Sequence, residues 1–315
     1  MEPSKDPLPV FPTIVGSGRS GTTLLRSMLN AHPELSIPRE SHFLVDLAST
    51  DGRLVANDDL DVPALVDRLG SNPWFQAWDL DLAEVEAQLG KTAPADLASA
   101  VRVVYSTYAH AHGKTRYGDK TPSYVMHMPT ILGLLPEARF VHLIRDGRDV
   151  ALSFLDASFG PDTVEEAALH WKQRVRRGRS AGRQLGPGRY LEVFYEDLVT
   201  RPEDALGAIC AFLDLPYHPQ MLRYRELLDD FIPTVDALPS HHENLAKAPR
   251  VTRSWQQEMS GHQVARFELL GGGELRRANY QLSGVRPTPA DVYHAAGTYT
   301  AWQTRRFKKK LGAAS

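Results

Sequence analysis

Residues 11–23 read Phe-Pro-Thr-Ile-Val-Gly-Ser-Gly-Arg-Ser-Gly-Thr-Thr, and the fold prediction begins with them. The apolar run at 11–15 is typical of a short buried strand. Glycines follow in close succession and indicate a turn, and apolar residues then recur at helical spacing over 24–29. A strand, a glycine-rich turn and a helix N-terminus in this order point free backbone N–H groups and the positive end of the helix dipole at a phosphate group.

The loop lacks the lysine of a nucleotide-hydrolysing protein. In the pattern G-x-x-x-x-G-K-[ST], a lysine follows the last glycine and reaches the terminal phosphates. Here Thr22 occupies that position, and Arg19 lies three residues earlier. The loop can hold one phosphate group but has no lysine for a γ-phosphoryl group. We therefore expect a donor in which a single 5′-phosphate carries the group to be transferred.

The same loop resembles a motif of a known family. Its sequence is similar to the 5′-phosphosulfate loop P-[KR]-S-G-T-T of the sulfotransferases that use 3′-phosphoadenosine 5′-phosphosulfate (PAPS). Glycine replaces the usual proline at position 18 and permits the same tight turn without fixing φ. The resemblance implies that the 5′-phosphate is bound by Gly18, Arg19, Ser20, Gly21, Thr22 and Thr23.

A second strand-to-helix junction follows the apolar run at 139–144. Residues 145–153 read Arg-Asp-Gly-Arg-Asp-Val-Ala-Leu-Ser. Arg145 stands at the predicted strand end, where a guanidinium can hold phosphate oxygens in a bidentate fork. Ser153 lies about two helical turns further on, and its hydroxyl can face the same side. The pattern resembles the motif in which the sulfotransferase family binds the 3′-phosphate of PAPS through these Arg and Ser positions.

Sulfuryl transfer also needs a base that removes the proton of the acceptor hydroxyl. Glu40 is the first candidate because it follows the phosphate-loop helix and a short predicted strand. Its position resembles that of the glutamate after "HP(D/E)" in the tyrosylprotein-type sulfotransferases. His42 is a rival, because the small-molecule sulfotransferases use a histidine base. Arg39 could orient Glu40 or bind an anionic acceptor.

Lys120 is the candidate for stabilising charge on the transferred group. Residues 117–122, Tyr-Gly-Asp-Lys-Thr-Pro, resemble a segment of the same families in which the lysine approaches the oxygen between phosphate and sulfate. A compact ammonium suits a developing point charge. Lys120 and Arg19 would neutralise the negative charge of the transferred group and the leaving phosphate, so we expect no metal ion.

Two further segments resemble the family loosely. Tyr195 begins a Tyr-Glu-Asp-Leu segment and could approach the nucleotide, although a core tyrosine fits equally well. Lys247 and Ser254 lie in a segment that resembles the loop closing over the cofactor. Arg148 is interpreted as a helix-surface or capping residue, and the basic run 172–179 as a solvated helix face that could attract an anionic substrate.

The composition fits a sizeable protein core. The chain has 315 residues, of which 42% are hydrophobic, and its formal net charge of −2 gives no sign of a nucleic-acid partner. Cys210 is the single cysteine, so no disulfide can form within one chain. The first residues are polar and proline-rich, and no apolar stretch is long enough to span a membrane. We therefore expect a cytoplasmic protein.

The predicted fold class is α/β: a three-layer α/β/α architecture with a central parallel sheet and a P-loop-like phosphosulfate loop. Residues 43–115 are helix-rich and are expected to form a helical insertion within a single domain over 1–315. A basic helix or tail is expected at about 290–315, and the glycines at 271–273 are expected to form a flexible turn. The predicted strands are 11–15, 35–37, 139–144 and 189–194.

These features predict a PAPS-dependent sulfotransferase, closest to the bacterial and tyrosylprotein-type branch. In-line transfer would release adenosine 3′,5′-bisphosphate (PAP), and the acceptor would be a hydroxyl of a small molecule, glycan, lipid or peptide. The alternatives are a P-loop-type small-molecule kinase, which Thr22 argues against, and a catalytically silent nucleotide-binding protein, which Glu40 and Lys120 argue against. The basic C-terminal segment is interpreted as solvated, with anionic lipid or an acidic partner as the alternative contact.

Overall fold

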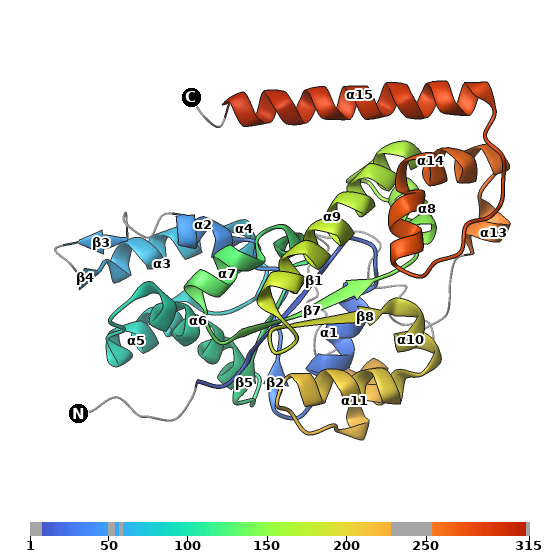
Figure 1. Cartoon of the computed structure of the whole chain (residues 1–315). Helices are drawn as coiled ribbons and strands as arrows, with labels where there is room; N and C mark the ends of the chain where they lie inside the picture. The colour runs from blue at the N-terminus through green and yellow to red at the C-terminus, as the bar shows by residue number, and fades with distance from the viewer. Residues whose placement is uncertain (1–7, 50–53, 57–58, 228–253, 313–315) are drawn as a thin grey trace.

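The computed structural model describes residues 8–49, 54–56, 59–227 and 254–312. At its centre lies a sheet of four parallel strands in the order β6–β1–β7–β8 (Figure 1). β1 and β7 are the inner strands, and every residue of β1 pairs with one of β7. The predicted parallel sheet is therefore confirmed. Its strands are β1 (Phe11–Gly16), β6 (Asp119–Lys120), β7 (Ala138–Ile144) and β8 (Tyr190–Phe194).

Side chains alternate between two apolar cores, one on each face of the sheet. On β1, Ile14 enters a core with leucines of α1, and the next residue, Val15, enters a core with residues of α7. Figure 1 shows α7 and α9 crossing the near face of the sheet. Helices on both faces confirm the three-layer architecture. The helices next to the sheet are α1 (Thr22–Asn30), α7 (Met128–Leu134), α8 (Gly147–Leu155), α9 (Val164–Leu185), α10 (Tyr195–Thr200) and α11 (Pro202–Phe212).

Two short strands differ from the sequence prediction. The predicted strand at 35–37 exists as β2 (Leu35–Ser36), but it pairs with β5 (Arg116–Tyr117) in a separate two-stranded sheet. The edge strand of the central sheet on the β1 side is β6, which the sequence did not indicate. β6 has two residues, both polar, so it shows no apolar period. Its pairing with β1 defines it as a strand.

Residues 43–115 are mainly helical, as expected, but they also contain a hairpin of β3 and β4. Asp61, Asn72 and Asp96 cap three of the helices by accepting a backbone N–H bond. Phe75 and Trp78 lie in the core of this region. Its elements are α2 (Phe43–Ser49), β3 (Val55–Ala56), β4 (Asp59–Leu60), α3 (Val62–Gly70), α4 (Pro73–Gln76), α5 (Leu82–Thr92) and α6 (Leu97–Ala111). The 3-10 helices η2 (Pro122–Met126) and η3 (Pro219–Leu227) follow further along.

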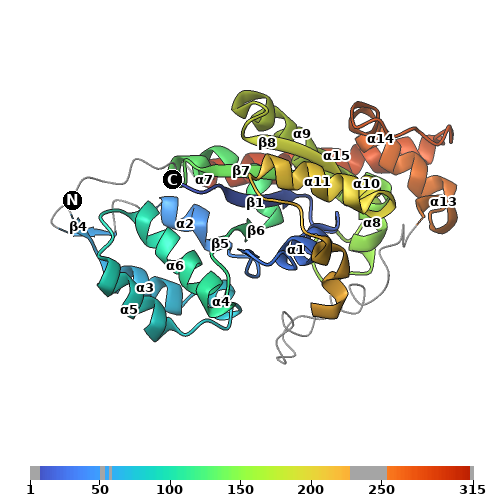
Figure 2. The same cartoon turned by 90° about the horizontal axis from the view of Figure 1, so that it is seen from below.

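The C-terminal part consists of α13 (Trp255–Glu258), α14 (Gly261–Arg277) and α15 (Pro289–Gly312). The prediction of a turn at 271–273 is wrong, because these glycines lie inside α14. Gly271 and Gly272 are buried, and α14 packs along α9, so tertiary contact overrides the weak helix propensity of glycine. Figure 1 shows α15 running past α14 along the upper edge of the molecule, and in the view of Figure 2 it lies behind the central strands. Across the described ranges, no helix combines the length and the apolarity that crossing a bilayer requires.

Gly178 lets α9 approach the sheet closely. A Cβ at this position would lie 2.5 Å from His142 Cε1 and 2.7 Å from Val125 Cγ2. His142 is fully buried on β7 and shares a 2.6 Å hydrogen bond with the Tyr190 hydroxyl, so it cannot give way. We expect Gly178→Ala to lower the free energy of unfolding by about 1–3 kcal/mol, measured by urea denaturation.

Gly133 on α7 is the matched control. A Cβ there would meet no atom within 4 Å among the described residues. Gly133→Ala should leave the free energy of unfolding unchanged or raise it by up to about 1 kcal/mol, because alanine has a higher helix propensity than glycine. Equal stability of the two variants would contradict the close packing of α9 on β7.

Candidate active site

The phosphate loop lies between the carboxyl end of β1 and the start of α1. Its backbone is left-handed at Arg19 (φ 68°) and at Gly21 (φ 93°), which caps α1. Gly21 has no side chain to bond the helix end, so the first N–H groups of α1 stay directed at the loop. The hydroxyls of Ser17 and Ser20 are buried and have no hydrogen-bond partner in any part of the chain that the structure describes. These donors fit an anion.

The two strand-to-helix junctions meet at the carboxyl edge of the sheet. Arg19 Nε donates a hydrogen bond of 2.9 Å to Oγ of Ser153 on α8, 134 residues further along the chain. The ring of Tyr195 fills the space beside Gly21 and lies 4.5 Å from the guanidinium carbon of Arg145. Neighbouring parallel strands have their carboxyl ends at one edge, so the β1–β7 pairing explains this arrangement.

Arg145 is the buried cation of the second junction. Its side chain is 8% exposed, and Nε and Nη2 have no hydrogen-bond acceptor within the described ranges. The carboxylate of Asp149 lies 4.0 Å from Nη2. Burial raises the pKa of Asp149 to about 6, although Arg145 and the Trp255 N–H group pull it down. Unsatisfied guanidinium donors are costly when buried, and two phosphate oxygens would satisfy them in a bidentate fork.

A third cluster joins Glu40, His42 and Lys120. Lys120 Nζ donates a 2.7 Å hydrogen bond to Glu40 Oε1, and His42 Nε2 lies 2.8 Å from Glu40 Oε2. Lys120 ends β6 in register with Ile14 of β1, which places it at the same sheet edge as the phosphate loop. The His42 ring packs on Trp74, with 4.1 Å between centroids. The predicted base, its rival and the predicted charge-stabilising lysine are therefore in direct contact.

The surroundings of Glu40 act on its pKa in opposite directions. Burial favours the protonated carboxyl, but the Lys120 ammonium and the His42 hydrogen bond outweigh it and hold the pKa at about 2. Glu40 is therefore ionised at neutral pH and can accept a proton. It is a weak base for as long as Lys120 stays paired with it.

Arg26 is a residue of this region that the sequence analysis did not identify. It is buried on α1, and its Nε donates to the carbonyl oxygens of Ile37 and Pro38 at 2.9 and 2.8 Å. These bonds fix the segment that leads into Glu40. A charged residue among the apolar residues of α1 was the available signal, because a buried cation needs acceptors.

The later predicted contacts have mixed outcomes. Lys247 lies outside the described residues. Ser254 precedes α13, and its hydroxyl donates to Gln256 at 2.6 Å, while the next backbone N–H, from Trp255, donates to Asp149 at 2.9 Å. Ser254 is thus linked to α8 through its neighbour. Within the described ranges, no three His, Cys, Asp or Glu side chains gather as metal ligands would.

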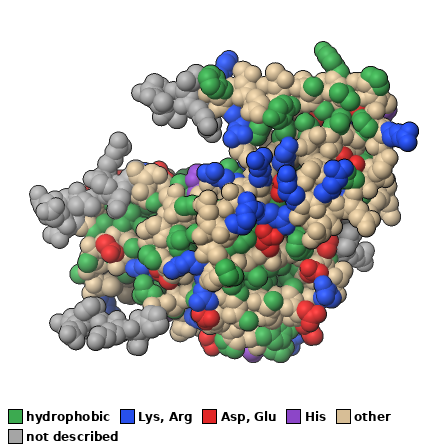
Figure 3. Space-filling model, viewed as in Figure 1, with side chains coloured by type: hydrophobic (Ala, Val, Ile, Leu, Met, Phe, Trp, Pro, Cys, Tyr) green, Lys and Arg blue, Asp and Glu red, His purple; other side chains and the backbone are tan. Residues whose placement is uncertain are grey.

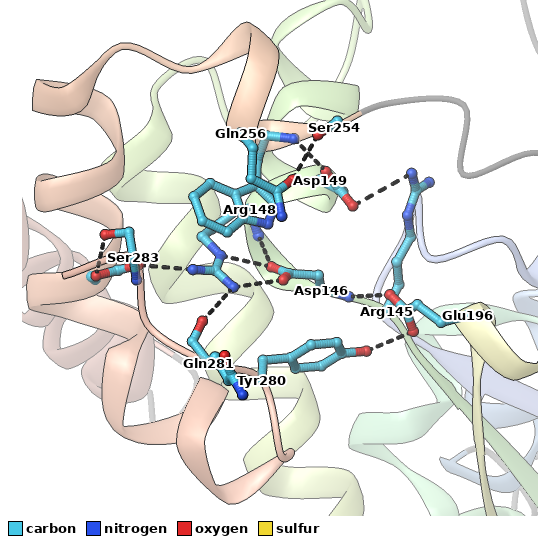
Figure 4. A network of polar contacts seen from close by, with 12 residues as sticks. Arg145, Asp146, Arg148, Asp149, Glu196, Ser254, Gln256, Tyr280, Gln281 and Ser283 are labelled. Carbon is cyan, nitrogen blue, oxygen red and sulfur yellow. Dashed lines mark hydrogen bonds and ion pairs between the residues drawn. The ribbon is translucent and has the colours of Figure 1, made fainter. Parts of the chain in front are cut away.

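The interpretation of Arg148 as a surface or capping residue is wrong. Arg148 is 1% exposed and is held by Asp146, Glu268 and the carbonyl of Gln281 (Figure 4). The acceptors Glu268 and Gln281 come from the C-terminal part of the chain, more than 100 residues away. Sequence spacing within α8 could not indicate partners at that separation.

The basic run 172–179 is only partly solvated. Lys172 donates to the carbonyl of Leu270 on α14, and Arg179 forms an ion pair with Glu192 on β8. These two side chains therefore hold neighbouring elements together. Figure 3 shows Lys and Arg side chains gathered over the centre of the face seen in Figure 1, where α9 lies.

Comparison with known proteins agrees with this arrangement. The sequence model described as "Sulfotransferase family" matches residues 9–219. Protein-tyrosine sulfotransferase 2 of Gallus gallus is 28% identical over 222 residues, which cover 68% of this chain and 54% of that protein. Protein-tyrosine sulfotransferase of Drosophila melanogaster is 26% identical over 223 residues, which cover 69% and 40%. The chain thus spans about half the length of these two relatives.

A solved structure is also similar to this chain. The sulfotransferase domain of the olefin synthase from Synechococcus PCC 7002 superposes with a TM-score of 0.59 at 25% sequence identity. The superposition covers 90% of this chain and 98% of that domain. The similarity therefore extends beyond the residues matched by the family model.

The contact between Lys120 and Glu40 generates a testable prediction. Lys120→Met removes the cation that most lowers the pKa of Glu40, so the pKa should rise from about 2 towards the ordinary 4.5. The measurement is a ¹³C NMR titration of the Glu40 carboxyl group. In the parent protein the depressed pKa stabilises the fold above about pH 4.5, and this contribution is lost as the pH falls towards 2.

Lys172→Met is the control, because Lys172 bonds a carbonyl of α14 rather than Glu40. It should leave the Glu40 titration unchanged. A Glu40 carboxyl that still titrates near pH 2 in Lys120→Met would show that the ion pair is not the cause of its low pKa.

Proposed function

This chain belongs to the sulfotransferase family, and from that premise we propose that it transfers a sulfuryl group from PAPS to an acceptor hydroxyl and releases PAP. The family match confirms the resemblance drawn from the sequence motifs. One observation carries the proposal: the two junctions with phosphate-binding chemistry meet, with Arg19 bonded to Ser153 at 2.9 Å. One bisphosphorylated nucleotide would therefore reach both.

The first junction would bind the 5′-phosphate side of the donor. Arg19 supplies a guanidinium, and the N-terminus of α1 supplies free N–H groups. The hydroxyl of Ser20 is buried without a partner within the described ranges, which supports a bound oxygen at this place. The residues proposed for this role are Gly18, Arg19, Ser20, Gly21, Thr22 and Thr23.

The second junction would bind the 3′-phosphate. Arg145 offers two buried donors that the described residues leave unpaired, and Ser153 offers a hydroxyl now bonded to Arg19. Tyr195 would support the nucleotide from the Arg145 side. Lys247 and Ser254 are proposed as further contacts from the segment before α13.

For the chemical step we propose Glu40 as the base. The acceptor hydroxyl would give its proton to the Glu40 carboxylate while its oxygen forms the new bond to sulfur. The bond between sulfur and the bridging oxygen would break, and its electron pair would remain on the 5′-phosphate of PAP. Lys120 and Arg19 would stabilise that charge. When Lys120 turns to the donor, Glu40 loses its strongest cationic partner and becomes a better base.

The acceptor class stays open. The relatives from Gallus gallus and Drosophila melanogaster are named protein-tyrosine sulfotransferases, which supports a hydroxyl acceptor. Small molecules, glycans, lipids and peptides all remain predictions. The cytoplasmic location and the contact of the basic C-terminal segment with anionic lipid or an acidic partner also stay predictions. A kinase is not favoured, because of the family match and Thr22.

Arg145→Ala tests nucleotide binding directly. We expect the affinity for PAP to fall by roughly 2 kcal/mol or more, because charge-assisted bonds to the 3′-phosphate would be lost. Isothermal titration calorimetry measures the affinity for PAP. Arg139→Ala is the control, since Arg139 lies at the other end of β7 and bonds Asp214 and the carbonyl of Phe212. Equal PAP affinity in the parent protein and Arg145→Ala would remove Arg145 from the site.

Glu40→Gln tests the base. We expect kcat for PAP release to fall on the order of 100-fold, with PAP affinity nearly retained, because the amide cannot accept the proton. His42, the rival for the role of base, contacts Glu40 at 2.8 Å. If Glu40 is the base, His42→Ala removes only this contact and should lower kcat less than Glu40→Gln does. The reverse order of the two effects would identify His42 as the base. Absence of PAP release from the parent protein with every acceptor class would refute the transferase assignment.

A further inference from the structure

Arg148 is a buried guanidinium at the start of α8, next to the proposed 3′-phosphate site. Its Nε and Nη2 donate to both carboxylate oxygens of Asp146, at 3.0 and 2.7 Å. Its Nη1 donates to Glu268 at 2.8 Å, and Nη2 also reaches the carbonyl of Gln281 at 2.9 Å. The ring of Trp255 covers the guanidinium, with 3.7 Å from its carbon to the ring centroid. All its directions are filled by protein groups.

These partners join two separate parts of the chain. Asp146 is the N-cap of α8 and directly follows Arg145. Trp255, Glu268 and Gln281 all lie beyond residue 219, where the match to the family model ends. Arg148 is therefore the point at which the C-terminal part is fastened to the strand-to-helix junction of β7.

Two further bonds attach the same C-terminal part beside Arg145. The backbone N–H of Trp255 donates to Asp149, whose other carboxylate oxygen faces Arg145 at 4.0 Å. The hydroxyl of Tyr280 donates to Glu196, which accepts the backbone N–H of Asp146. The bond from Trp255 to Asp149 is 2.9 Å long, and the bond from Tyr280 to Glu196 is 2.8 Å long. They place carboxylates on the two flanks of Arg145 (Figure 4).

The charge around the junction requires Arg148. Four carboxylates, from Asp146, Asp149, Glu196 and Glu268, lie close to a site proposed to bind an anion. Asp149 accepts the Trp255 N–H bond, and Glu196 accepts from the Tyr280 hydroxyl and the Asp146 N–H group. Arg148 pairs with both Asp146 and Glu268, and its single positive charge offsets half of their negative charge. Without it, these carboxylates would repel a phosphate group.

We infer that Arg148 is a positioning residue for recognition of the nucleotide 3′-phosphate: through Asp146 and the C-terminal segment 254–283 it holds Arg145 in place and offsets part of the nearby negative charge. The inference rests on the proposed function, because it assumes that the 3′-phosphate binds at Arg145. It extends the site to residues that the sequence motif does not include.

The test is the ratio of the dissociation constants for adenosine 5′-monophosphate and PAP, measured by calorimetry on the full chain. These ligands differ only in the 3′-phosphate, so a general loss of stability or of adenine binding cancels in the ratio. Arg148→Lys keeps the charge but loses the planar fork and the stacking on Trp255. We expect the ratio to fall at least fivefold, mainly through weaker PAP binding.

Arg266→Lys is the matched control. Arg266 lies on α14, as Glu268 does, and it too pairs with two carboxylates, those of Asp291 and Glu165, but it makes none of the contacts described around Arg145. It should leave the ratio within twofold of the parent value. A similar fall in Arg266→Lys would overturn the inference, since loosening of α14 alone would then explain the result.

Asp146→Asn covers the case in which Arg148→Lys fails to fold. Asparagine still caps α8, but its amide opposes Nη2 of Arg148 instead of accepting from it. The ratio should again fall severalfold. An unchanged ratio in either folded variant would overturn the inference and leave the proposed function intact. A parent protein that does not prefer PAP to adenosine 5′-monophosphate would overturn both.

Discussion

The parallel pairing of β1 with β7 is the constraint on which the site depends. It sets the phosphate loop beside Arg145, although Gly21 and Arg145 are 124 positions apart in the chain. The hydrogen bond from Arg19 to Ser153 and the packing of Tyr195 beside Gly21 both follow from this register. The short β6 adds Lys120 at the same edge. The segments that follow β1, β7 and β8, together with β6, thus meet at one edge because the strands are parallel.

Lys120, Arg19 and Arg145 at this edge each contact another protein group. Lys120 is bonded to Glu40, Arg19 to Ser153, and Arg145 faces Asp149 at a longer distance. These contacts differ in strength. The Lys120–Glu40 contact is charged and short, whereas the guanidinium of Arg145 keeps two unsatisfied donors within the described ranges. A phosphate group that binds Arg145 would therefore displace almost no protein contact, whereas one that binds Lys120 would have to displace Glu40.

The sequence predicted the elements whose signals are local. The apolar run and glycines of the phosphate loop identified β1 and α1, and the order of Arg145 and Ser153 identified the second junction. Signals that depend on distant contacts were absent. β6 is too short to show a period, the glycines at 271–273 are helical because α14 packs on α9, and Arg148 has acceptors more than 100 residues away.

The contrast between Arg145 and Arg148 explains why a motif alone does not define an anion site. The two arginines lie three residues apart at one junction and are both buried, yet only Arg148 has all its directions filled by protein groups. Arg145 keeps donors available because, among the residues that the structure describes, no carboxylate approaches it closer than 4.0 Å. That separation depends on Asp149 being bonded to Trp255, and Asp146 to Arg148. Because these carboxylates are engaged elsewhere, the Arg145 guanidinium is available to an external anion.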